Sequence, residues 1–455
     1  KDILRFRNKW GNILGSLMWK QILNPRIQFN NNLSYSRYRV KDIRSFLVHS
    51  KDDESHLNHS NSLSFVQDFT LKSDWKYSLA KLWSIDFGFQ SSYLAFQPNV
   101  YWDHLESSRN NEGVINGIES ALYFENHISF NAYVDMNIGL RGVHYLTENF
   151  TAQSLEPRLD ISFSPITSQA INFTYMKTNQ FSQMVFSSGS FLTNEVWIPS
   201  GTNIEPASTA QYSVGWKGSF LNNGINAEIG LYQKQMNNLV AFKEGYSNLR
   251  GDAFWESKIE TGGIGMSKGI EFFLNKDIGD WTGFLSYTYS ITTRQFNNIN
   301  NGKPFVFEYD RPHSFTIDIY KKINEKWTAN ALWVYQTGLP YTPAIGRYYA
   351  PYNSVDGIIY ENEVLIYGDR NSERMRPYHR LDIGLKYFTK TKWGKDATWT
   401  ISIYNVYNRQ NPYFYYYNSK PGLNFGTIEN RSGFQKLYQF SYFPILPTVS
   451  YTVEF

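Results

Sequence analysis

The chain has 455 residues, of which 18% are aromatic and 18% are charged. The share of charged residues is below the roughly 25% of ordinary soluble domains. The longest apolar runs, such as ALWVY at 331–335, are nevertheless far shorter than the about 20 residues of a membrane helix. Cysteine is absent, which excludes disulfides and cysteine-based zinc sites, and the net charge of +4 is spread along the chain and gives no indication of nucleic-acid binding.

An alternation of period two recurs along the chain, as expected of strands with two unlike faces. In chain order it is clear at 26–35 (RIQFNNNLSY), 131–140 (NAYVDMNIGL), 281–291 (WTGFLSYTYSI) and 379–387 (HRLDIGLKY). In each segment, apolar side chains share one face and polar side chains share the other. The polar faces carry the aspartates of the predicted strands, namely Asp86, Asp135, Asp160, Asp318 and Asp382. Because a charge that faces lipid is costly, these carboxylates are expected to face a polar lumen.

The segments between these strands differ in length in a regular way. Short turns are predicted at 166–169, 221–224, 278–280, 323–326 and 390–396. Long polar connections are predicted at 42–60, 98–113, 183–205, 241–264, 295–309, 341–376 and 413–434. This asymmetry, with aromatic residues at strand ends such as 413–417, predicts an all-β fold, a transmembrane antiparallel β-barrel with about 17 strands present. The alternative is a soluble sandwich or propeller, but the strands are long for either and no blade-length repeat is found.

The number of predicted strands is odd, whereas single-chain bacterial barrels have an even number. If the last strand runs toward the periplasm, the first strand of this chain runs the same way. The pattern therefore predicts that residues 1–455 are the C-terminal portion of a longer barrel.

Eight motifs in order resemble the TonB-dependent outer-membrane transporters, in particular the branch with a carboxypeptidase-regulatory-like N-terminal domain. They include EPRLDISFSP (156–165), EVWIPSGTNIEPASTAQYSVGWK (195–217), YQKQMNNLVAFKEG (232–245), YDRPHSFTIDIYKKINEKWTANALWVYQTGLPYT (309–342), YGDRNSERMRPYHRLDIGL (367–385) and FPILPTVSYTVEF (443–455). The resemblance covers roughly residues 155–455.

The resemblance implies a 22-stranded barrel around an N-terminal plug domain, so the plug and about five strands would be missing here. It implies a protein of the cell outer membrane that binds a solute at extracellular loops and imports it through a plug-gated lumen. The implied partners are outer-membrane lipid and the TonB-ExbB-ExbD motor, which acts through the missing plug. The resemblance also allows a surface lipoprotein lid. The resemblance implies no enzymatic activity and no cofactor. The alternatives are a passive porin or channel, an outer-membrane enzyme and an adhesin.

Aromatic side chains in the long loops are the candidate ligand contacts, because they give large amphipathic area at low entropy cost. These candidates are Trp197, Trp255, Tyr348, Tyr349 and Tyr352. The alternative is that they only pack the loops together or lie at the headgroup level.

Two polar clusters invite a chemical interpretation. HSKDDESHLNH (49–59) holds three histidines and three acidic residues, a possible site for zinc, copper or haem iron, but a solvated loop explains it equally well and no metal is assigned. In YDRPH, Asp310, Arg311 and His313 lack a second catalytic element nearby in the sequence, so a structural ion pair at the barrel rim is predicted and no catalytic residue is assigned.

The chain closes on PTVSYTVEF, and nine residues are enough for a tilted strand to cross the bilayer. Val449, Tyr451, Val453 and Phe455 are expected to face lipid, and Glu454 to face the lumen. The terminal aromatic resembles the signal that the outer-membrane assembly machinery recognises, so Phe455 is the predicted contact with that machinery.

Overall fold

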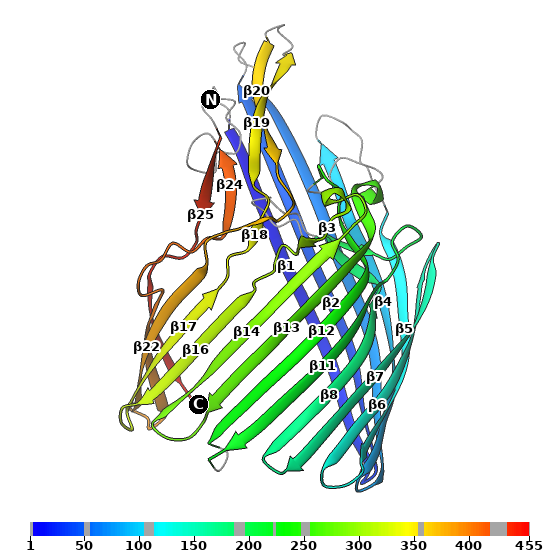
Figure 1. Ribbon diagram of the computed structural model, residues 1–455, viewed down its shortest axis with the longest axis vertical. Coiled ribbons are helices and arrows are strands. Elements are labelled where there is room, and N and C mark those ends of the chain that lie inside the picture. Colours follow the sequence, from blue (N-terminus) through cyan, green and yellow to red (C-terminus); the bar gives the residue numbers. More distant parts are fainter. Residues whose placement is uncertain are drawn as a thin grey trace.

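The computed structural model describes residues 3–49, 55–103, 113–185, 196–221, 224–246, 255–353, 359–418 and 435–454. One antiparallel sheet of eighteen strands forms a curved wall (Figure 1). One of the eighteen, β15, has two residues, which leaves seventeen longer strands and confirms the number expected from the sequence. In order around the wall the strands are β1 (Ile3–Asn24), β2 (Ile27–His49), β3 (Ser55–Ala80), β4 (Trp83–Asp103), β5 (Ile115–Ser129), β6 (Val134–Thr147), β7 (Thr151–Ile166), β8 (Gln169–Gln180), β11 (Ala207–Phe220), β12 (Ile225–Phe242), β13 (Ile259–Lys276), β14 (Trp281–Gln295), β15 (Phe305–Val306), β16 (His313–Lys322), β17 (Trp327–Gln336), β22 (Tyr378–Lys390), β23 (Asp396–Tyr404) and β26 (Leu446–Val453).

Each strand pairs with the strands next to it in the order just given. β1 pairs with β2, and β26 pairs with β23; within the described residues neither of these two strands has a partner on its other side.

Short turns join the strands at the lower end in Figure 1, where the sequence predicts them. The strand bounds leave turns at 166–169, 276–281, 322–327 and 390–396, whereas residues 222–223 of the turn predicted at 221–224 lie outside the described part of the chain.

The upper end carries the smaller elements, including β18, β19, β20, β24 and β25 (Figure 1). They are the two-stranded sheets β9 (Ser182–Val185) with β10 (Val196–Pro199), β18 (Pro340–Tyr341) with β21 (Glu373–Arg374), β19 (Ala344–Asn353) with β20 (Ile359–Tyr367) and β24 (Phe414–Asn418) with β25 (Lys436–Phe440), and the 3-10 turns η1 (Trp255–Lys258) and η2 (Asn300–Gly302). No helix in the described ranges is both long and apolar enough to cross a membrane.

The strands reach further into two predicted loops than the sequence indicates. β2 continues to His49 and β3 begins at Ser55, inside the polar stretch 42–60, and β4 continues to Asp103, inside 98–113. Above the bilayer both faces of a strand meet water, so the apolar alternation disappears while backbone pairing continues. Residues 413–417 also differ from the prediction, because β24 pairs with β25 in a hairpin outside the main sheet and is not part of its aromatic girdle.

The outer face of the sheet carries two rows of aromatic side chains. In the lower row, the ring centroids of Trp327 and Tyr387 lie 4.6 Å apart. In the upper row, Tyr335 and His379 lie 6.4 Å apart. Eight residues of β17 separate Trp327 from Tyr335, a rise of about 20 Å for a strand tilted by about 40°. The spacing of the two rows is therefore slightly less than the about 25 Å height of the apolar band of an outer-membrane barrel.

Candidate functional site

The inner face of the wall is polar, and several of its charged groups are paired within a strand or across strands. In the lower part, Asp86 on β4 lies 3.0 Å from Nε2 of His127 on β5 and 3.9 Å from Nζ of Lys76 on β3. Nδ1 of His127 in turn lies 2.7 Å from the amide oxygen of Asn137 on β6. Four neighbouring strands thus contribute to one polar network.

The other aspartates assigned to polar faces also have polar partners. Asp135 accepts a hydrogen bond from Ser129, Asp160 from Thr174, Asp318 from Tyr320, and Asp382 forms an ion pair with Arg380. These contacts agree with the prediction that the carboxylates point away from lipid.

A second network lies beside a glycine on β4. Lys72 forms a 3.0 Å ion pair with Asp74, and the hydroxyl of Tyr123 donates to Asp74. Gly88 lies opposite Tyr123 in register, and a methyl group there would overlap the carbonyl oxygen of Ser73 and the Tyr123 hydroxyl. The missing side chain at Gly88 therefore makes room for the Asp74–Tyr123 bond.

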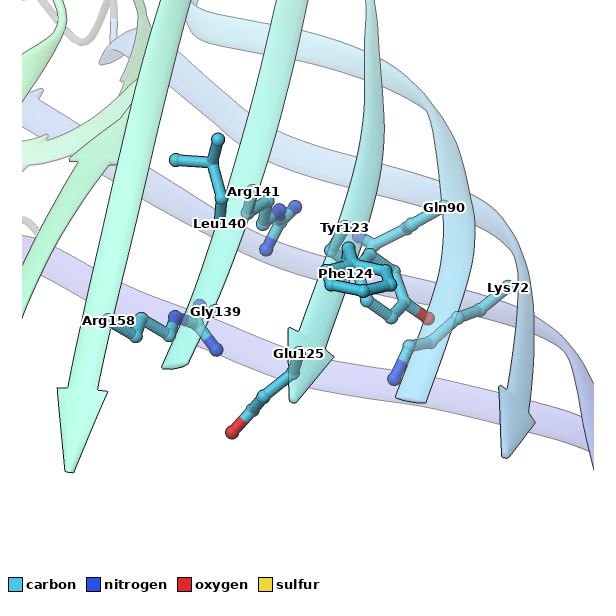
Figure 2. A pocket seen from close by; sticks show the side chains of 9 residues that line it. All are labelled: Lys72, Gln90, Tyr123, Phe124, Glu125, Gly139, Leu140, Arg141 and Arg158. Carbon is cyan, nitrogen blue, oxygen red and sulfur yellow. The ribbon is translucent and has the colours of Figure 1, made fainter. Parts of the chain in front are cut away.

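Further along the wall, Arg141 lies 3.4 Å from the carboxylate of Glu119, and its Nε is buried without a hydrogen-bond partner. Arg158 on β7 lies opposite Gly139 on β6, and its guanidinium group takes part in no hydrogen bond or ion pair with a described residue. Figure 2 shows Lys72 at one side of this stretch and Arg158 at the other, with Tyr123 and Glu125 between them.

These side chains surround a small pocket of about 110 Å³. The residues lining it are Lys72, Gln90, Tyr123, Phe124, Glu125, Gly139, Leu140, Arg141 and Arg158. Three of these side chains are cationic (Lys72, Arg141 and Arg158) and one is a carboxylate (Glu125), an arrangement suited to hydrogen bonding with a polar solute or chain segment. The described residues contain no group of three or more histidine, aspartate and glutamate side chains that could hold a metal ion.

The upper end is held together by three apolar clusters, which include two of the predicted ligand contacts. Trp255 is only 4% exposed and lies in a cluster with Val185, Val196, Ile198, Ile204, Val240, Phe242 and Ile259. Trp197 is partly buried against a second cluster of Leu94, Phe96, Ala121, Val143, Tyr145 and Phe181. A third cluster contains Leu239, Phe296, Ile299 and Phe305. Both tryptophans thus pack loops against the wall, and a ligand contact by either stays a prediction.

The predicted tyrosine contacts lie on the β19–β20 hairpin. Tyr348 is 52% exposed and Tyr349 is 48% exposed. The backbone of Tyr352 pairs with Tyr360, but its side chain is outside the described part of the chain. Ligand contact by these three tyrosines likewise stays a prediction. The histidine-rich stretch 49–59 cannot be placed as a cluster either, because 50–54 and the side chains of His49, His56 and His59 are outside that part.

Asp310 forms the ion pair expected at the rim, and its partner lies far away in the sequence. Its side chain is 1% exposed and lies 2.5 Å from Nη2 of Arg374 on β21. The other carboxylate oxygen accepts a 2.7 Å hydrogen bond from the backbone N–H of Thr292. Arg311 donates instead to Gln336, and His313 lies 3.0 Å from the Tyr287 hydroxyl.

The ion pair belongs to a clasp, a set of hydrogen bonds that joins three segments of the upper end, namely 306–310, residue 338 and 371–374. Nη1 of Arg374 donates to the carbonyl oxygens of Asp310 and Gly338. The side-chain amide of Asn371 donates to the carbonyl oxygen of Val306. Sequence reasoning missed Arg374 and Asn371, because their partners lie in distant segments and no local pattern marks them.

Comparison with known proteins agrees with this architecture. The sequence model of the family described as TonB dependent receptor-like, beta-barrel matches residues 5–408. The chain belongs to this family. It is therefore an outer-membrane β-barrel of a family of transport receptors and not of enzymes.

Among curated proteins, the ferric-pyoverdine BN7/BN8 receptor of Pseudomonas putida is 27% identical over 100 residues, which cover 21% of this chain and 11% of that receptor. Among solved structures, the ferric-catecholate import receptor Fiu of Escherichia coli K12, in its closed form, shares 12% identity and a TM-score of 0.62. The match covers 98% of this chain and 64% of Fiu. The siderophore receptor PiuA of Acinetobacter baumannii shares 14% identity and a TM-score of 0.59, over 98% of this chain and 65% of PiuA. The chain thus spans less than two thirds of the length of these relatives.

Proposed function

We propose that the complete protein actively imports a solute across the outer membrane. The observation that carries this proposal is the two-faced wall, with aromatic rows outside and a network of charges from β3 to β7 inside. A wall of this kind surrounds a polar interior, which in a transporter contains a gate and a path for a polar solute.

The gate in this proposal is a plug domain that these 455 residues do not contain, with about five further strands in a 22-stranded barrel. The TonB-ExbB-ExbD motor pulls on the plug from the periplasmic side, and the loops of the upper end capture the solute. The solute is a ferric chelate, since the named relatives receive ferric catecholate, ferric pyoverdine or other siderophores. A surface lipoprotein that closes over the loops is compatible with the same scheme.

The test is uptake of ⁵⁵Fe-labelled ferric tris-catecholate by cells that express the full-length protein in place of their own receptors. Active transport predicts uptake that stops when TonB is deleted or the proton gradient is collapsed. Uptake that continues unchanged under both conditions would show a passive porin. A lipoprotein that co-purifies with the receptor from detergent extracts would show that the receptor has a lid, and a receptor that purifies without one would show that it has none.

A further inference from the structure

Two arginines rest on neighbouring phenylalanine rings at the upper end of the wall. The guanidinium carbon of Arg294 lies 3.9 Å from the ring centroid of Phe307, and that of Arg370 lies 5.2 Å from the ring centroid of Phe305. Phe305 and Phe307 are two residues apart in an extended segment, and Phe305 lies opposite Arg294 in register. The two guanidinium groups, which come from β14 and from the segment after β20, therefore meet over one small surface.

The surface beneath them is rigid. Phe305 is 5% exposed, belongs to the third apolar cluster and stacks on Phe296 at 6.2 Å. The backbone N–H of Arg370 donates to the side-chain oxygen of Asn300 at 2.8 Å, and the next residue, Asn371, is anchored to Val306. Phe307, which lies under Arg294, donates its backbone N–H to the carbonyl oxygen of Thr292 at 3.0 Å, so both guanidinium groups have a fixed support.

Within the described residues, neither guanidinium group takes part in a hydrogen bond or an ion pair, and the Nε of each is buried without a partner. Burial lowers the pKa of Arg370, and the carboxylates of Glu308 and Glu244 oppose this effect from beyond ion-pair distance. The Glu244 carboxylate is already engaged, since it accepts a 2.8 Å hydrogen bond from Asn300. Partly buried cations that keep all their donors unused are uncommon, because desolvating a charge without a partner is costly.

We propose that Arg294 and Arg370 form a binding site for an oxyanion with paired oxygens, such as the carboxylate of an incoming solute. Stacking on the rings occupies one face of each guanidinium and leaves its N–H edges available for bidentate bonds. Arg294 lies on the polar face of β14 with Thr292 and Ser290, so this site is presented to the interior and not to lipid. As a site for the transported solute it rests on the proposed function, but anion binding can be measured without transport.

The test uses the full-length protein in detergent micelles and citrate alone as the probe, with binding followed by titration calorimetry at low ionic strength. We expect saturable citrate binding that weakens as KCl is raised. Arg294→Gln and Arg370→Gln should each weaken it at least tenfold. The matched control is Arg347→Gln, which removes an arginine of the β19–β20 hairpin that is already paired with Glu363 at 2.7 Å, and it should change affinity less than twofold. Resistance to trypsin and the heat-dependent shift on gels report folding of each variant.

Absence of saturable citrate binding to the folded wild-type protein, or equal binding by the folded Arg294→Gln and Arg370→Gln variants, would overturn the anion site. Uptake of iron chelates measured in parallel tests the proposed function separately. Citrate binding that depends on the pair, without TonB-dependent uptake of any chelate, would support the anion site and refute the transport function. TonB-dependent uptake, together with citrate binding that does not depend on the two arginines, would support the transport function and refute the anion site.

Discussion

Removing the carboxylate of Asp310 should open the clasp at the upper end. The Asp310→Ala variant loses the ion pair with Arg374 and leaves the backbone N–H of Thr292 without its acceptor. The two bonds from Arg374 to the carbonyl oxygens of Asp310 and Gly338 can remain. The change is thus confined to two contacts of one carboxylate that is 1% exposed.

The size of the effect follows from these two contacts. A buried N–H without a partner costs about 1–3 kcal/mol. Breaking a fully buried ion pair costs about 3–5 kcal/mol, but Arg374 is 29% exposed and keeps two acceptors, so the loss of its partner is smaller. We therefore expect the free energy of local opening to fall by about 2–4 kcal/mol. Asp310→Asn keeps an acceptor for Thr292, so its effect should be about half as large.

Hydrogen–deuterium exchange on the full-length protein in micelles measures this opening in the segments 305–312, 337–342 and 370–376. The control is Asp396→Ala, which breaks the exposed 3.8 Å pair with Lys390 at the opposite end of the wall and should change stability by less than about 1 kcal/mol. Asp310→Ala should change the exchange rates in these segments more than Asp396→Ala changes those of the turn 390–396. If it does not, the Asp310 carboxylate does not hold the loops together and the reasoning fails.

Three further changes test the wall itself. Gly88→Ala should prevent correct assembly, seen as loss of the heat-dependent gel shift. The control Gly11→Ala, with no atom within 4 Å of its added methyl group, should assemble normally. Equal assembly of the two variants would contradict the close packing at β4. Tyr451→Ala removes a ring 4.6 Å from that of Trp399 and should lower the free energy of unfolding in urea by about 0.5–1.5 kcal/mol beyond the lost buried area. Deleting Phe455 should lower outer-membrane insertion in cells, and normal insertion without it would count against its role as an assembly signal.

The wall was predictable because its pattern is local. Strands in contact with lipid must alternate, so the period-two segments identify β2, β6, β14 and β22, and compact polar stretches such as 323–326 mark their turns. The same reasoning could not find the ends of β2, β3 and β4. Once a strand leaves the bilayer its sequence is under no lipid constraint, and only backbone pairing with a neighbour shows that it continues.

The site was less predictable because its contacts are between distant segments. Asp310 was identified as a rim residue, but its partner Arg374 is 64 residues away and no spacing rule connects them. Arg294 and Arg370 come together because Phe305 of β15 supports Arg370 and Phe307, just after β15, supports Arg294. Loop tryptophans could be selected by residue type, but sequence could not reveal that Trp255 is buried in an apolar cluster.

The length of β3 has a consequence for what can approach this protein from outside. Its 26 residues, at about 3.3 Å each and a tilt of about 40°, rise by about 65 Å, of which the hydrocarbon band takes about 25 Å. About 40 Å of hydrogen-bonded wall therefore stands above the hydrocarbon, well beyond a headgroup layer that is about 5–8 Å deep on each side. A molecule that approaches from outside therefore meets the paired backbone of β2, β3 and β4 before it reaches the level of the hydrocarbon.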